Sequence, residues 1–127
     1  MRRHLSLPLA GIAVLFAAPA VRAQDATVAD PDHYTVEFEN DQVRIVRVSY
    51  GPGEESVMHE HPAHAAVILS DDQVWKMTDE SGETQEVEGS LGQAIWAEAA
   101  THLPENLTDH RQNVILIEVK QRGEDEP

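Results

Sequence analysis

Residues 53–61, which read GEESVMHEH, contain the feature that constrains the fold most: the pair His59 and His61, separated from Gly53 by five residues. In an extended strand, side chains alternate between faces, so residues i and i+2 point the same way. His59 and His61 therefore direct two imidazoles to one place, while Glu60 faces away. Imidazole suits zinc, copper, iron and nickel, so this pair is half of a metal site. The alternative is a surface strand that happens to carry two histidines, and the rest of the chain decides between them.

The first residues of the chain have the pattern of a secretory signal peptide. Arg2 and Arg3 form a charged start, residues 5–20 are apolar, and Val21 and Ala23 are small residues at the two positions that a signal peptidase reads. The apolar stretch is shorter than the roughly 20 residues that a membrane helix needs. We therefore expect a bacterial protein that is periplasmic or secreted, with no membrane association after cleavage.

The expected cleavage site lies after Ala23, with Ala20 as the alternative. The chain of 127 residues is long enough for one domain and too short for two. It is expected to consist of a signal peptide (1–23), a single domain (24–120) and a disordered acidic tail (121–127).

The charge of the chain excludes two classes of partner. The net charge is −14, and loss of Arg2, Arg3 and Arg22 with the signal peptide would take it to −17. A surface so acidic repels nucleic acids and anionic membranes. Cysteine is absent, so thiol chemistry by the protein itself is excluded and the fold depends on a packed core or a metal.

Short extended segments separated by turn residues fill the mature chain. They lie at residues 34–38, 43–50, 57–61, 65–69, 74–78, 84–87, 92–97 and 114–120. Their even spacing and the absence of a long amphipathic helix predict an all-β sandwich or barrel. Within 43–50, the apolar phase changes between Ile45 and Val46, which predicts a bulge and turns Arg44 and Arg47 outward.

Two motifs in the sequence resemble the two motifs of the cupin superfamily. The first is Gly53, five residues and His59-x-His61; the second is Gly92, a strand, Ala100-Thr101-His102, three residues and Asn106. The resemblance covers nearly all of the mature chain and is closest to the small, secreted, single-domain cupins of bacteria. It implies the cupin double-stranded β-barrel, which is jelly-roll-like, with the site in its mouth. It also implies that His59, His61 and His102 bind a divalent transition metal: iron, zinc, manganese or nickel.

The chain departs from the cupin pattern where a glutamate ligand is usual. In cupins, three or four residues separate the second histidine from this glutamate. The corresponding positions in this chain are Ala65 and Ala66. Three residues are candidates to replace it: His64, Glu98 and Glu105. A histidine placed like His64, in a turn, is more often solvated than bound to a metal. An acidic residue such as Glu98 is more often exposed than a ligand in so acidic a chain. In the second motif, Glu98 and Ala100 replace the usual proline and glycine. His102 also lies one residue closer to the start of the motif than the histidine of the usual pattern.

The missing carboxylate has a chemical consequence. Three neutral imidazoles leave the full charge of a divalent ion uncompensated, which favours an anionic or chelating ligand. Cupins with all-histidine iron sites, such as thiol and diketone dioxygenases, use this arrangement. The resemblance therefore implies a metal-dependent dioxygenase acting on a small organic molecule as the sharpest enzymatic hypothesis.

Two other functions stay open at this point. One is a non-catalytic cupin that captures a small ligand, and the other is a metal-free, isomerase-like cupin in which His102 and Glu105 form an acid–base pair. Nucleophilic hydrolysis fits poorly, because no serine, Ser56 included, is expected beside a histidine with an orienting carboxylate. A small-molecule ligand or substrate is the expected partner, and the exposed edges of a barrel make a homodimer a further candidate.

Overall fold

The structure, a computed structural model, describes residue 11 and residues 22–121. The proposed signal peptide apart from residues 11, 22 and 23, and the tail beyond residue 121, lie outside the described residues. Within the described part of the chain, no helix is long and apolar enough to cross a membrane.

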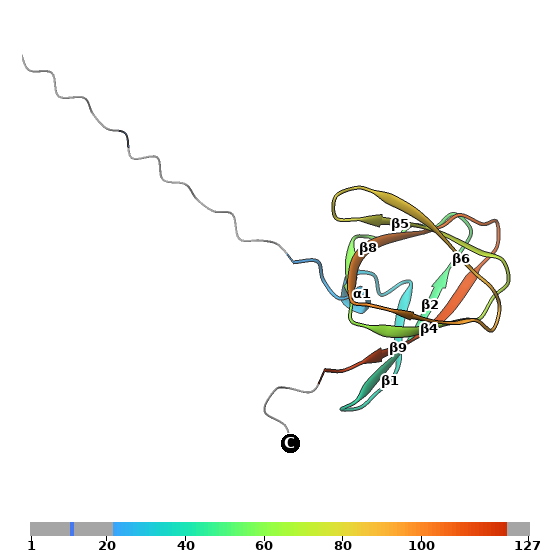
Figure 1. Cartoon of the computed structure of the whole chain (residues 1–127), viewed down its shortest axis with the longest axis horizontal. Helices are drawn as coiled ribbons and strands as arrows, with labels where there is room; N and C mark the ends of the chain where they lie inside the picture. The colour runs from blue at the N-terminus through green and yellow to red at the C-terminus, as the bar shows by residue number, and fades with distance from the viewer. Residues whose placement is uncertain (1–10, 12–21, 122–127) are drawn as a thin grey trace, which may run out of the picture.

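Two antiparallel sheets face each other (Figure 1). The five-stranded sheet has the order β1-β2-β9-β4-β7, with bounds Tyr34–Glu39, Val43–Tyr50, Gln112–Val119, His64–Ile68 and Ala94–Ala97. The four-stranded sheet has the order β3-β8-β5-β6, with bounds His59–His61, Ala100–Asn106, Gln73–Asp79 and Thr84–Gly89. One short helix, α1 (Ala26–Ala29), packs against β1 and β3. The prediction of an all-β fold is confirmed.

Alternation along the strands builds the interior between the sheets. In β2 the buried residues are Val46, Val48 and Tyr50, and the inward positions of β9 include Val114 and Leu116. Each of these side chains faces a partner on the neighbouring strand in register, for example Val46 opposite Leu116 and Val48 opposite Val114. The apolar core is therefore a layer between the sheets, as expected of two packed sheets.

The predicted bulge lies opposite Ile45 and Val46, as expected, but the extra residue is on β1 and not on β2. β2 pairs with β9 without interruption from Val43 to Tyr50, whereas the register with β1 shifts between Val36 and Phe38. Because β2 itself alternates regularly, Arg44 shares the inward phase of Val46, and the prediction that Arg44 faces outward is wrong. The predicted outward position of Arg47 is confirmed, since Arg47 is exposed.

The sequence analysis did not predict β8, a strand that contains Pro104. A proline cannot donate a ladder hydrogen bond, so it argues against a strand interior. The carbonyl of Pro104 accepts from the Ser56 amide at 3.0 Å, on the side away from β5. The missing N–H of Pro104 lies on that same side, since both backbone groups of a residue in an antiparallel strand point the same way. The ladder between β8 and β5 therefore loses no bond.

Asn106, the asparagine of the second motif, has a structural role at the end of β8. It is fully buried, and its amide group donates to the carbonyls of Gly51 (2.9 Å), His110 (2.8 Å) and Tyr50 (3.3 Å). Its carbonyl oxygen accepts from the backbone and hydroxyl of Thr108. One side chain thus joins the turn after β2 to the loop before β9.

We expect Asn106→Ala to lower the free energy of unfolding by about 2–4 kcal/mol, because buried carbonyls lose their donor. Urea unfolding followed by circular dichroism measures this change. Leu107→Ala, at a neighbouring side chain that is 40% exposed, is the control and should cost less than about 1 kcal/mol. Equal losses in the two variants would contradict the role given to Asn106.

Candidate metal centre

The pairing of β3 with β8 brings three histidines together. His59 lies directly opposite His102, and His61 lies opposite Ala100. Residues opposite each other in an antiparallel pair share a face, and so do residues i and i+2. The rings of His59, His61 and His102 therefore meet on the inner face of the four-stranded sheet, and the small side chain of Ala100 leaves room beside His61.

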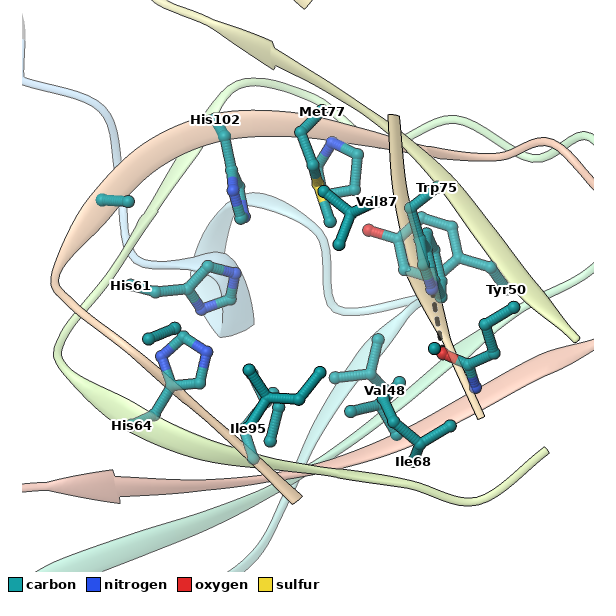
Figure 2. A pocket seen from close by; sticks show the side chains of 18 of the residues that line it. Val48, Tyr50, His61, His64, Ile68, Trp75, Met77, Val87, Ile95 and His102 are labelled. Carbon is teal, nitrogen blue, oxygen red and sulfur yellow. Dashed lines mark hydrogen bonds between the residues drawn. The ribbon is translucent and has the colours of Figure 1, made fainter. Parts of the chain in front are cut away.

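The three rings are close enough to share one ion. Their centroids are 4.6 Å apart for His59 and His61, 5.2 Å for His59 and His102, and 5.0 Å for His61 and His102. One ring nitrogen from each lies within 4.8 Å of the others. His59 is fully buried, and His61 and His102 line a cavity into which both rings point (Figure 2). The histidine cluster expected from the sequence is present.

A buried serine determines which nitrogen of His59 is free. The Ser56 hydroxyl donates to Asp30 Oδ2 at 2.6 Å, and Ser56 Oγ lies 3.2 Å from His59 Nδ1. Since the only hydroxyl proton is directed at Asp30, Oγ accepts, and Nδ1 of His59 carries the proton. Nε2 of His59 is then the atom with a free lone pair. Contrary to the expectation from sequence, Ser56 does lie beside a histidine and a carboxylate, but as an acceptor and not as an activated nucleophile.

The remaining nitrogens fit a metal ion. Nε2 of His59 lies 2.9 Å from Nε2 of His61, and Nε2 of His102 is buried without a hydrogen-bond partner among the described residues. Two nitrogens bound at about 2.1 Å and at a right angle would lie about 3.0 Å apart. A proton on His61 Nε2 would satisfy the first pair, but it would leave His102 Nε2 unpartnered. A divalent transition metal bound by three imidazoles satisfies all three atoms.

Burial keeps the rings of His59 and His102 uncharged. Burial, with the neighbouring rings adding to it, lowers the pKa of His59 to about 4 and that of His102 to about 3. Neutral imidazole is the form that binds a metal, so both residues are ready to act as ligands over the physiological range.

His64 is part of the site, although a solvated position was the more common expectation. It is 7% exposed, lies on the inner face of β4 and lines the cavity. Its Nδ1 donates to the Pro62 carbonyl at 2.8 Å, so Nε2 has the lone pair. Burial lowers its pKa. Its ring centroid is 5.5 Å from that of His61, and His64 is not in the group of nitrogens that can share one ion.

Neither of the carboxylates singled out from the sequence joins the cluster. Glu98 is exposed at the rim of the cavity, where its Oε1 accepts from the indole N–H of Trp96 at 2.8 Å. Glu105 lies three residues after His102 on β8, so its side chain leaves the opposite face of the strand. There it pairs with Lys76 at 2.8 Å. The structure does not bring Glu105 together with His102.

The structure reveals a buried carboxylate that the sequence analysis did not consider. Glu118 on β9 is 2% exposed and lies next to His61, with 3.9 Å between Oε1 and Nδ1. Burial opposes its charge, but the His61 ring and the hydrogen-bonded Arg44 guanidinium outweigh burial and lower the pKa of Glu118. The alternation of β9 contained the signal, because Glu118 is in phase with the buried Val114 and Leu116.

A cavity of about 270 Å³ extends from the histidines between the two sheets (Figure 2). Its far end is formed by Trp75, Tyr50, Val48 and Ile68, and its lining is mainly apolar. Among the residues that the structure describes, no lysine or arginine lines it, and Glu88 and Glu98 are its only carboxylates. The cavity suits a small ligand with an apolar body.

Comparisons with known proteins agree with this fold. No protein-family profile and no curated protein sequence matches the chain. Among solved structures, it is similar to a cupin domain from Bordetella pertussis Tohama I, with 21% identity, a TM-score of 0.64, and 69% of this chain and 92% of that one covered. It is also similar to a cupin superfamily protein from Desulfitobacterium hafniense DCB-2, with 17% identity, a TM-score of 0.51 and coverage of 69% and 76%. A third similar structure is an RmlC-like cupin with a double-stranded β-helix fold from Methanocaldococcus jannaschii, with 14% identity, a TM-score of 0.51 and coverage of 71% and 83%. The chain therefore has the cupin fold.

The lowered pKa values predict how the metal-free protein responds to acid. Above about pH 6.5, His59 and His102 are neutral in both the folded and the unfolded protein. Below this pH the unfolded chain binds protons at both residues, whereas in the folded protein His59 is protonated only near pH 4 and His102 only near pH 3. The free energy of unfolding should therefore fall as the pH drops from 6.5 to 4.

Urea unfolding in the presence of a chelator at several pH values measures this dependence. His102→Gln removes one of these rings, so its slope between pH 6.5 and 4 should be shallower by up to about 1.4 kcal/mol per pH unit. The contributions of carboxylates elsewhere cancel between the two proteins. Parallel curves for parent and variant would show that His102 titrates normally in the folded protein.

Proposed function

We propose that this protein with a cupin fold binds a divalent transition metal through His59, His61 and His102, and that it acts on a small organic molecule held in the adjoining cavity. The observation that carries the proposal is the unpartnered, buried Nε2 of His102 beside the close pair of Nε2 atoms of His59 and His61. Buried polar atoms are rarely left without a partner.

A divalent metal held by three neutral imidazoles would act as a strong Lewis acid with coordination positions free for a substrate. We propose iron as the resident ion and oxygenation as the class of reaction; zinc, manganese and nickel are the other candidates. The all-histidine set supports this choice, since in the described chain neither Glu98 nor Glu105 lies with the three rings.

The side chains of the cavity would select and handle the substrate. The apolar wall excludes water and holds an apolar body, and no cationic side chain of the described residues is present there to bind a carboxylate. Arg44, which is half-buried nearby, is already paired with Asp25 and Glu118. Nε2 of His64 has a free lone pair on the cavity wall, so His64 can accept a proton from a bound molecule.

A second candidate function is capture of a small ligand without catalysis. It is favoured by the apolar lining of the cavity and by the absence of a lysine among the described residues that line it. The metal-free, isomerase-like function has less support, because it relied on a His102–Glu105 pair and Glu105 is paired with Lys76 on the other face of β8.

Export to the periplasm or beyond belongs to this proposal. Its support is the pattern of residues 1–23: two arginines, an apolar stretch and small residues before the expected cleavage site.

The proposal predicts that the mature protein, purified from its native compartment, contains one transition metal ion per chain by elemental mass spectrometry. His59→Ala/His61→Ala and His102→Ala should each lose the metal, because two imidazoles or fewer hold the ion too weakly. His110→Ala is the matched control, since His110 is an exposed histidine elsewhere in the fold and its loss should leave the metal content unchanged. A metal-free parent, or triad variants with the full metal content, would refute the site.

Oxygen uptake separates catalysis from capture. Iron-loaded protein should consume oxygen with at least one member of a panel of small apolar molecules that carry an enol, thiol or catechol group, and His102→Ala should not. If no member of the panel supports oxygen uptake while some bind stoichiometrically, the oxygenase proposal is wrong and ligand capture is favoured.

A further inference from the structure

Glu118 occupies the inward position at the end of β9, where two other strands meet it. In register it lies opposite Arg44 on β2 and opposite His64 on β4. It is 2% exposed, and a carboxylate so deeply buried is rare unless it is paired.

Within the described residues, only one of the two carboxylate oxygens of Glu118 has a hydrogen bond. Oε2 accepts from Arg44 Nε at 2.6 Å, whereas Oε1 is buried and has no partner in the part of the chain that the structure describes. Nδ1 of His61 is also buried and makes no hydrogen bond with residues 22–121, and it lies 3.9 Å from Oε1. The two unpartnered atoms therefore face each other, and a shift of about 1 Å would bring them to hydrogen-bond distance.

Arg44 holds this carboxylate in its orientation. Its Nη2 donates to Asp25 Oδ2 at 2.6 Å, so the guanidinium is fixed between two carboxylates. Asp25 in turn caps helix α1 through the Thr27 amide, and the segment before the helix is tied to β3 by a hydrogen bond from the Glu60 amide to the Gln24 carbonyl. Glu118 cannot turn away from His61 without breaking this chain of contacts.

We propose that Glu118 is a positioning residue for His61: Oε1 accepts the proton of Nδ1 and so keeps Nε2 of His61 free and directed, together with Nε2 of His59, at the metal. The inference rests on the proposed metal site and deepens it. The carboxylate that is missing as a direct ligand is supplied from β9 as the partner of a ligand.

The alternative tautomer of His61 is disfavoured by simple electrostatics. With the proton on Nε2, the lone pair of Nδ1 would face a carboxylate oxygen in a buried environment, where two acceptors repel and neither is solvated. With the proton on Nδ1, donor faces acceptor. A carboxylate behind a metal-bound imidazole both fixes the ring and strengthens it as a ligand.

The direct test is Glu118→Gln, which keeps the size of the side chain and replaces the charged oxygens by an amide. Affinity for zinc or iron(II), measured by competition with a chromophoric chelator, should fall about 10- to 100-fold. The matched control is Glu37→Gln. Glu37 also pairs with the Nε of an arginine on β2, Arg47, but it lies on the edge strand β1, which pairs with none of the strands that carry the histidines. Its substitution removes the same charge and the same kind of pair. The control should bind within threefold of the parent.

A second readout does not depend on metal binding. Two-bond ¹H–¹⁵N spectra of the metal-free protein distinguish Nδ1–H from Nε2–H imidazoles, and His61→Gln assigns the signal. We expect Nδ1–H for His61 in the parent and a shift towards Nε2–H in Glu118→Gln. If the parent already has Nε2–H on His61, or if Glu118→Gln changes neither tautomer nor affinity, the inference is wrong. If the parent has the Nδ1–H tautomer but binds no metal, the positioning of His61 stands and the proposed metal function fails.

Discussion

The register of β3 against β8 is the constraint on which the rest of the site depends. Placing His59 opposite His102 puts three imidazoles on one inward face, where there is little water to solvate them. A shift of one residue would turn His102 to the outer face of its strand. Because the buried rings of His59 and His102 resist protonation, the same register that gathers the histidines also keeps the lone pairs of these two residues available.

Two chains of polar contacts support the cluster from different parts of the sequence. Next to His59, the Ser56 hydroxyl donates to Asp30 and accepts from Nδ1 of the ring. Near His61, the paired residues Glu118 and Arg44 bring a negative charge into the interior together with its counter-charge. Buried charges are tolerated when they are paired and hydrogen-bonded. The negative charge of Glu118 therefore lies close to the proposed ion, although the group of atoms that can bind the ion consists of three histidine nitrogens and no carboxylate oxygen.

Much of the fold and part of the site were predictable from the sequence, because they depend on local patterns. Alternation identified most strands, and β2 lies at the predicted residues 43–50. The strand β8, which contains Pro104, was not predicted. Whether a proline fits within a strand depends on which side of that strand has a hydrogen-bonded neighbour, and only the sheet arrangement shows this. The inward position of Arg44 was missed for a similar reason: the irregularity between β1 and β2 was placed on the wrong strand.

The sequence by itself determined that His59 and His61 share a face, because that follows from the geometry of a single strand. It also determined the motif spacing that pointed to His102, and the strongly negative charge of the chain. Only the tertiary structure decided which other groups reach the histidines: His64 and Glu118 do, whereas Glu105 does not. The contact of Glu118 with His61 joins strands far apart in the chain, and the inward position of His64 depends on the pairing of β4 with β9. Both are decided by the register and packing of the two sheets rather than by any local pattern of residues.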